Sequence, residues 1–436
     1  MRDIHRHISR QQFAFFICCV LLTALIYSKF ALSVCMIALL VLGLIEWNPE
    51  RAFPLRFNRA FGRNWRSYLR YRPYLALSAF FLLVLVGGFD LQDPQYWQER
   101  LRLKLPFLLF PFAFASIPPF SRRQYLGLFY FLLLLLSYSS IDVGIHYWQH
   151  FEPINQAMQR GQPIPTPMSH IRYSLLLALG VMGGAYLWWR GYYWRHPGER
   201  YLILGLTLFL FGFLHVLSVR SGLLTLYAAI LLWSLYYVWR TGRIIVGAGT
   251  RIALLGLPLL AYQYVPSFRA KARYAIYDLE RYAVGEGATY SDSERLHSLQ
   301  LGIEIGCDHL LLGVGAGNLR REVHRRYAQR YPNQPAKMPH NQFVSVFAGS
   351  GLLWRLLFCL AFFYPLFYRH NYREPLFALL HLVVLISFLM ENTLETSIGV
   401  ALYCTLLLVG LNYRSGKPGK KSAPQTEAGP ISIIRS

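Results

Sequence analysis

The sequence predicts an all-α integral membrane protein: a bundle of about twelve transmembrane helices with a large, partly helical loop on its outer side. Of its 436 residues, 55% are hydrophobic and 16% aromatic, and the apolar residues fall in long blocks. Such blocks are typical of membrane-spanning helices. The basic residues gather in alternate connecting segments, as expected when cytoplasmic loops carry the excess of Lys and Arg.

Apolar stretches that could cross a bilayer with their flanking residues, at about 17 to 25 residues each, recur along the chain. They centre on residues 13–28, 30–45, 74–89, 105–118, 125–147, 173–189, 201–218, 221–238, 252–264, 343–368, 375–390 and 396–412. We interpret residues 1–412 as a single transmembrane domain. The first stretch is expected to stay as an anchor, because no clear cleavage site follows it.

The charge pattern predicts the orientation of the helices. With the N-terminus inside, the inner segments hold +19 of the net charge of +23. Both termini are therefore expected in the cytoplasm, with residues 413–436 as a disordered cytoplasmic tail. Because the basic excess follows the topology, we do not interpret it as a nucleic-acid-binding surface.

One outer segment, residues 265–340, is large enough to build a site. Within it, Ser291–Ile305 and a segment from about Asn318 to Arg330 are predicted to be helices that fold over the outer mouth of the bundle. The glycine-rich segment 313–317 separates them. No predicted strand precedes these glycines, which disfavours a nucleotide-binding interpretation.

His340 lies where this loop returns to an apolar stretch. Histidine is the side chain best suited to exchange a proton near neutral pH, although a structural or helix-capping role is the alternative. As one helix, residues 341–368 would span about 42 Å, longer than a bilayer core of about 30 Å. We therefore expect its first turns to project into a vestibule wall, with Arg355 near the outer edge as an anion contact.

Arginines at outer helix ends are candidates for binding an anion. Arg220 lies in the short turn Ser218–Gly222, and Arg295 lies in the first loop helix. Two guanidinium groups facing one site would hold a diphosphate without a metal, because each offers two parallel donors and keeps its charge. The alternatives are that Arg220 reaches lipid phosphates and that Arg295 pairs with Glu294 or Asp292.

The other acidic residues and the histidines give little support to a different kind of site. Glu391 and Glu395 lie in the outer turn between the last two stretches and are alternative bases or partners for the arginines. The histidines lack zinc-site spacing and no Asp-x-Asp pair occurs, so neither a metal nor a cofactor is expected. Acidic residues are nearly absent from the predicted spans, and Asp142 is the main one. Their scarcity disfavours an ion-coupled transporter.

These motifs resemble the O-antigen ligase family, which comprises polytopic glycosyltransferases related to O-antigen polymerases. The resemblance rests on His340-Asn341 followed by nine residues and Gly351, on Arg295-x-x-x-Leu299, and on Arg220 in its short outer turn. One position departs from the pattern: Trp354 stands where a small or hydroxylated residue is expected.

The resemblance implies transfer of a glycan from undecaprenyl diphosphate to a sugar hydroxyl of lipid A-core, at the periplasmic face of the bacterial inner membrane. His340 would be the general base of this inverting, metal-independent reaction, and Arg220 and Arg295 would bind the diphosphate. Supporting contacts are expected from Arg172, Asn341, Arg355 and His170. The expected partners are the lipid-linked glycan donor, the lipid A-core acceptor and membrane lipid, with no nucleic acid.

Two other functions stay open at this point. An O-antigen polymerase would transfer the glycan to another lipid-linked glycan. A lipid-linked-glycan transporter or flippase, which belongs to a different class, would use the basic groups only to hold a diphosphate. Charges in a transporter would more often line a path through both leaflets, whereas here they gather on one side.

Overall fold

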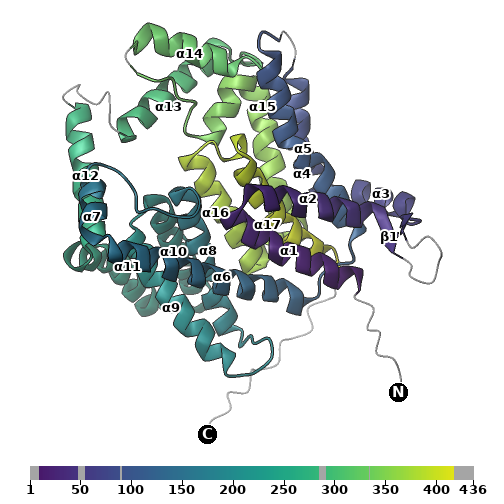
Figure 1. Cartoon of the computed structure of the whole chain (residues 1–436), viewed down its shortest axis with the longest axis horizontal. Coiled ribbons are helices and arrows are strands. Elements are labelled where there is room, and N and C mark those ends of the chain that lie inside the picture. Colours follow the sequence, from purple (N-terminus) through teal and green to yellow (C-terminus); the bar gives the residue numbers. More distant parts are fainter. Residues whose placement is uncertain (1–8, 48–54, 89–90, 284–290, 333, 417–436) are drawn as a thin grey trace.

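The computed structural model describes residues 9–47, 55–88, 91–283, 291–332 and 334–416 (Figure 1). The first helices are α1 (Arg10–Tyr27), α2 (Lys29–Leu44), α3 (Phe61–Arg70), α4 (Arg72–Val86), α5 (Pro94–Ser116), α6 (Arg122–Gln149), α7 (Phe151–Gln159), α8 (His170–Trp189) and α9 (Glu199–Leu217). They are followed by α10 (Arg220–Thr241), α11 (Ile244–Tyr264), α12 (Pro266–Ala283), α13 (Ser291–Asp308), α14 (Leu319–Arg330), α15 (Gln342–Phe367), α16 (Pro375–Met390) and α17 (Ser397–Ser415). Two short 3-10 helices, η2 (Tyr368–Arg373) and η3 (Thr393–Glu395), flank α16, and the strands β1 (Ile45–Trp47) and β2 (Leu55–Phe57) pair antiparallel.

Each predicted apolar stretch overlaps one helix, and several of the stretches run one to three residues past the helix end. Among the described residues, eight helices are long and apolar enough to cross a membrane: α1, α6, α8, α9, α10, α11, α15 and α17. The bent pair α3–α4 would be a ninth, while α2 and α16 are apolar but only 16 residues long. The all-α class is therefore confirmed, and the count of twelve spans stays a prediction.

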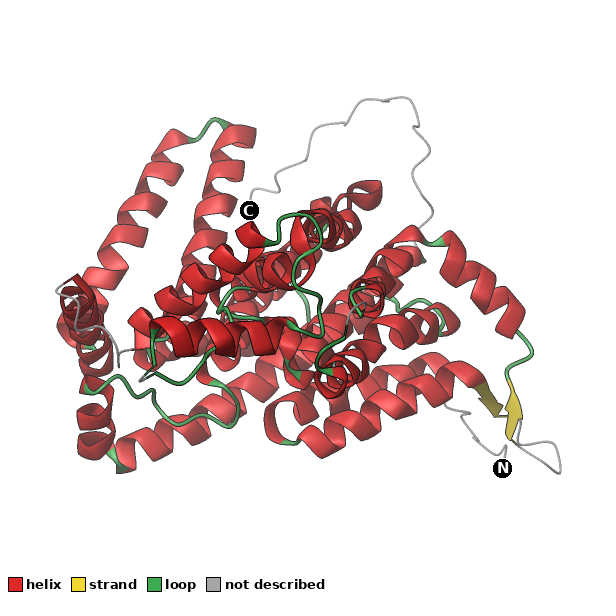
Figure 2. Ribbon diagram, turned by 90° about the horizontal axis from the view of Figure 1, so that it is seen from above, coloured by secondary structure: helices red, strands yellow, loops and turns green. Residues whose placement is uncertain are grey.

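The bundle is built around α17. Every residue of α17 from Gly399 to Tyr413 is buried, as expected for a helix surrounded on all sides by other helices. Its neighbours are α1, α5, α6 and α16, and the two strands lie at one edge of the molecule (Figures 1 and 2). At one end of the bundle, α13 and α14 lie beyond α15 (Figure 1).

Polar side chains define where several helices begin. Ser121 forms a capping box with Gln124 at the start of α6, in which each side chain satisfies a backbone N–H of the other residue. The side chain of Asn341 accepts the N–H of Val344 at 3.1 Å and so opens α15. Thr396 caps α17 in the same way.

The described part of residues 265–340 contains three helices, so the prediction of two was wrong. The observed α13 and α14 match the predicted pair closely, but α12 precedes them. Basic residues recur along α12 and interrupt its apolar pattern, so the sequence shows only a weak helical period. Ser267 at its start donates to the carbonyl oxygen of Val216 at 2.6 Å, which attaches α12 to the last turn of α9.

The prediction of one continuous helix over residues 341–368 was also wrong. At Gly351 the backbone has φ +79° and ψ −176°, so α15 breaks there. A Cβ at this position would lie 2.3 Å from the carbonyl oxygen of Leu311, and Leu352 donates its N–H to Leu310 at 2.8 Å. The length argument for a projecting vestibule wall therefore fails, and residues 342–350 form a separate helical segment.

The glycine-rich segment 313–317 packs against this break. Gly313 has φ +67°, and a Cβ there would lie 2.4 Å from the backbone nitrogen of Ser350. Val314 donates its N–H to the carbonyl of Ala348 at 3.2 Å. Gly313 thus permits a close approach between two backbones.

The expected cytoplasmic tail begins later than predicted. Residues 413–415 belong to α17, which continues to Ser415. Residues 417–436 lie outside the described residues, so the prediction of disorder stays a prediction for them.

Candidate functional site

The candidate site lies where the ends of four helices meet. His170 and Arg172 open α8, Arg295 lies in the first turns of α13, His340 immediately precedes the start of α15, and Glu391 follows α16. Packing of α13 against α15, of α15 against α16 and of α16 against α8 brings these ends together. Charged and titratable groups from distant parts of the chain therefore share one end of the bundle.

Two arginines converge on one carboxylate. Arg172 Nη2 lies 3.4 Å from Glu391 Oε2, and these two side chains are only 11% and 14% exposed. Arg295 also acts electrostatically on Glu391 and on the imidazole of His170. The structure thus brings Arg295, Arg172 and His170 together, as the sequence-based site requires.

His340 is half-buried beside two cations. Its backbone N–H donates to Ser298 Oγ at 3.3 Å, which attaches it to α13. Burial, followed by the positive charges of Arg295 and Lys337, lowers the pKa of His340 to about 4, while Glu294 opposes the shift. The imidazole is therefore neutral at pH 7 and free to accept a proton.

Asn341 connects two of the helix ends. Its side-chain oxygen caps α15, while its Nδ2 donates to the carbonyl oxygen of Leu389 at 3.2 Å. Leu389 lies near the end of α16, two residues before Glu391. Asn341 thereby helps to set the position of His340 relative to Glu391.

The two carboxylates of the α16–α17 turn have opposite environments. Burial raises the pKa of Glu391, and Arg172 and Arg295 offset this only in part. Burial would also raise the pKa of Glu395, but ion pairs with Lys104 at 2.8 Å and Arg100 at 2.9 Å hold it well below its usual range. Glu395 is therefore the permanent anion, and Glu391 is the carboxylate that can more readily take up a proton.

Arg220 lies at the same end of the bundle as Arg172. It is the first residue of α10 and its side chain is exposed. The next residue, Ser221, places its Oγ 3.2 Å from Ser174 Oγ in the first turns of α8. Its predicted contact with a diphosphate stays a prediction, although its place beside the start of α8 is compatible with one.

Arg355 follows the break in α15. Its guanidinium carbon lies 5.4 Å from the ring centroid of Phe347, a cation–π distance. The expectation that Arg355 lies at the outer edge assumed a continuous helix, and that assumption was wrong. Its role as an anion contact stays a prediction without that support.

A comparison with known families found a match to the part of the chain that contains most of these residues. Residues 167–359 match the model of the O-antigen ligase family. The chain contains an O-antigen ligase domain. This range runs from just before α8 into the second half of α15, so it includes His170, Arg172, Arg220, Arg295 and His340. No curated protein matches the chain at a significant level.

Two lysines of the O-antigen ligase domain were missed in the sequence analysis. Lys271 on α12 acts electrostatically on His170 and donates to the carbonyl oxygen of Gly161 at 2.6 Å. Lys337 forms an ion pair with Glu294 and lies three residues before His340. The spacing from His340 was a usable signal for Lys337, whereas Lys271 required knowledge of α12.

A mainly apolar cavity with one charged wall lies beside the first part of α15, between that segment and helices α4 and α5. Its volume is about 60 Å³, and its polar wall includes Arg100, Lys104, Gln342 and Glu395. Gln342 accepts the N–H of Leu394 at 2.7 Å, so the wall also supports the start of α15.

Among the residues that the structure describes, no group of three or more His, Cys, Asp or Glu side chains could hold a metal ion.

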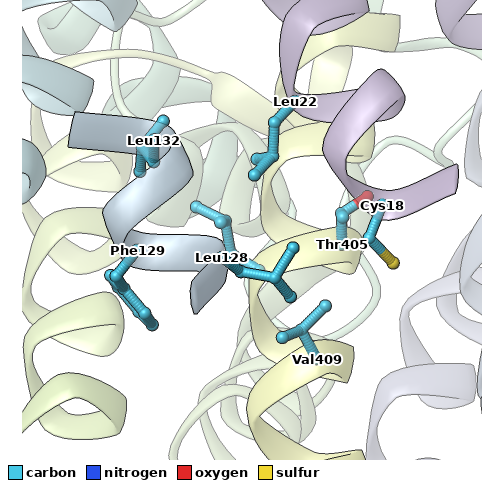
Figure 3. A pocket seen from close by; sticks show the side chains of 8 residues that line it. Cys18, Leu22, Leu128, Phe129, Leu132, Thr405 and Val409 are labelled. Atoms are coloured by element: carbon cyan, nitrogen blue, oxygen red, sulfur yellow. The ribbon is translucent and has the colours of Figure 1, made fainter. Parts of the chain in front are cut away.

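A second cavity has a different character. Figure 3 shows it between α1, α6 and α17, with Cys18, Leu22, Leu128 and Val409 among its lining residues. It measures about 20 Å³ and is almost entirely apolar. It is a gap in helix packing rather than part of the candidate site.

Proposed function

We propose that this chain is an O-antigen ligase that transfers a glycan from undecaprenyl diphosphate to a sugar hydroxyl of lipid A-core, in the periplasmic leaflet of the inner membrane. The family match supports glycan transfer of the ligase or polymerase type. The observation that carries the specific proposal is the convergence of Arg172 and Arg295 on Glu391, beside the neutral imidazole of His340.

The arginines bind the diphosphate of the donor. Arg172 and Arg295 already face one negative charge, that of Glu391. A diphosphate entering this cluster would meet guanidinium groups that are partly removed from water, where charge–charge interactions are stronger. Arg220, at the same end of the bundle, adds a third cation. As the glycosidic bond breaks, these groups stabilise the negative charge that grows on the leaving diphosphate.

His340 acts on the acceptor. The acceptor hydroxyl oxygen attacks the anomeric carbon while its proton passes to the imidazole. The bond between the anomeric carbon and the phosphate oxygen breaks, and its electron pair leaves with the diphosphate. Attack from the face opposite the leaving group inverts the anomeric centre.

Donor binding and base strength are coupled in this scheme. Arg295 and Lys337 lower the pKa of His340 in the empty site. A bound diphosphate offsets their positive charge and raises the pKa of His340 toward its ordinary value. The imidazole thus becomes a stronger base when the donor is in place.

Reconstitution tests this function and its two alternatives. The purified chain is placed in liposomes with lipid-linked glycan and is offered either lipid A-core or a second lipid-linked glycan as acceptor. Extension of lipid A-core supports the ligase. Extension of the second lipid-linked glycan supports the polymerase, and movement of the donor between leaflets without transfer supports the flippase.

A further inference from the structure

Helix α3 carries a dense basic face that the proposed reaction does not use. Arg63, Arg66 and Arg70 are exposed and recur at helical spacing, so they lie on one side of the helix. On another side, Trp65 and Leu69 are 46% and 45% exposed. This pattern of one cationic side and one apolar side is typical of helices that lie at a membrane surface.

The orientation of α3 fits such a surface. It meets α4 at a bend of 85°. Because α4 is an apolar helix that packs along α5, a helix perpendicular to it lies parallel to the bilayer plane. The residue after α4, Gly87, accepts the N–H of Ala316 at 3.0 Å from the loop between α13 and α14. Thus α3 lies at the end of α4 that is opposite the candidate site.

Buried contacts fix which side of α3 faces the bundle. Asn64 and Tyr68 are buried, and Tyr68 Oη lies 2.8 Å from Ser78 Oγ of α4. Ser78 in turn donates to the carbonyl oxygen of Phe107 in α5 at 3.1 Å. The helix therefore has a fixed rotation about its axis.

That rotation turns the apolar side toward the bilayer. The ring centroid of Trp65 lies 5.9 Å from that of Phe112, which is one turn inside the end of α5. The indole therefore packs beside the last turns of α5, and about half of the Trp65 residue is left uncovered by protein. The three arginines lie on the side away from these contacts, at the depth of lipid headgroups.

We propose that α3 binds anionic phospholipid headgroups of the leaflet opposite the candidate site, through Arg63, Arg66 and Arg70, with Trp65 and Leu69 inserted at the acyl-chain boundary. Positive charge near an anionic surface contributes about fivefold in affinity for each basic residue. A basic excess that only set the topology would need no such arrangement. It would not require the arginines and the apolar residues to segregate on separate sides of one docked helix.

Lipid titration of the full-length protein tests this proposal. Native mass spectrometry would compare the affinity for phosphatidylglycerol with that for zwitterionic phosphatidylcholine. The test variant is Arg63→Gln/Arg66→Gln/Arg70→Gln. The matched control, Arg240→Gln/Arg243→Gln/Arg251→Gln, removes the same charge from the exposed α10–α11 region, and a triple Arg→Lys variant of α3 keeps the charge.

We expect the α3 Gln variant to lose at least about tenfold of its preference for phosphatidylglycerol, and the control and Lys variants to lose less than about threefold. If the Gln variant unfolds at a lower temperature than the wild type, Arg66→Gln alone should still lose about fivefold. An unchanged preference in the α3 Gln variants would overturn the proposal. An equal loss in the α10–α11 control would also overturn it, because lipid binding would then follow net charge alone.

Discussion

At the scale of single residues, the reactivity of the site depends on which charges surround each titratable group. Glu391 and Glu395 are four positions apart in one turn, yet burial dominates the first and two close cations dominate the second. His340 is kept neutral by burial and by Arg295 and Lys337. A base that stays unprotonated can act as soon as an acceptor hydroxyl arrives.

Removal of the His340 imidazole should separate catalysis from binding. We expect His340→Ala to lower the transfer rate by about 10²- to 10⁴-fold, because the proton of the acceptor then has no positioned base. The affinity of His340→Ala for the lipid-linked donor should stay near that of the wild type, whereas Arg295→Ala should lower this affinity. His297→Ala, on the same helix as Arg295, is the matched control. Wild-type rates in His340→Ala would refute the general-base role.

The pH profile should reveal the charge on Arg295. Because the base must be unprotonated, kcat/KM of the wild type should fall only as the pH approaches about 4, the pKa of His340. Arg295→Gln removes a positive charge, so the pKa of His340 should rise and the fall should occur at higher pH. Glu294→Gln should move it in the opposite direction, since Glu294 raises that pKa. Identical profiles for the three proteins would contradict this assignment.

At the scale of elements, the break in α15 decides how the site is supported. Gly351 allows the chain to leave the helical path, and the glycine-rich segment 313–317 fills the space against it. The short helix over residues 342–350 is thereby held between α13 and the α16–α17 turn. His340 lies just before the N-terminal end of this segment, so the same contacts set its position.

Substitution of Gly351 should destabilise the protein. In Gly351→Ala the new Cβ would meet the Leu311 carbonyl oxygen at 2.3 Å in a backbone conformation with φ +79°. Strain of this kind costs about 1 to 3 kcal/mol, and relief of the clash would shift the start of α15. The thermal unfolding midpoint in detergent and the transfer rate should both fall. Gly212→Ala is the control, because it lies in α9 with nothing within 4 Å, and an equal effect there would contradict the argument.

At the scale of the whole molecule, one buried charge cluster links distant parts of the chain. Glu395 holds Lys104 and Arg100 of α5, and Gln342 at the start of α15 binds the same turn. The first third of the chain is thereby attached to the end of the domain that carries His340. A buried ion pair of this kind is costly to break from one side only.

Neutralising Glu395 should therefore have a large effect on stability. Glu395→Gln leaves the buried Lys104 without its anion and removes one of the two carboxylates that pair with Arg100, and it should cost about 3 to 5 kcal/mol. Glu391→Gln, with its 3.4 Å contact to Arg172, should cost much less. Because the pKa of Glu395 is lowered in the fold, its contribution is present above the ordinary carboxyl pKa and is lost as the pH falls. Thermal unfolding midpoints at pH 7 measure the difference between the two variants. Midpoints of the wild type at pH 7 and at about pH 3, between the ordinary and the lowered pKa, measure the loss with pH. Equal midpoints for the two variants would contradict the cluster's role.

The sequence by itself determined the helical membrane class, the positions of the apolar helices, α13 and α14, and the family. These follow from local patterns: long apolar blocks, helix caps and short motifs around Arg220, Arg295 and His340. Family membership is confirmed over residues 167–359. The roles of these residues stay predictions.

Only the tertiary structure decided how those residues are combined. It added Lys271, Lys337 and the Arg172–Glu391 pair to the site, and it replaced a straight helix with the break at Gly351. A residue pattern reports which side chains a helix carries, but the distance between groups such as Arg172 and Glu391, more than 200 positions apart in the chain, depends on packing. Electrostatic interaction falls with that distance, so the pKa of His340 and the charge of its surroundings could be obtained only from the fold.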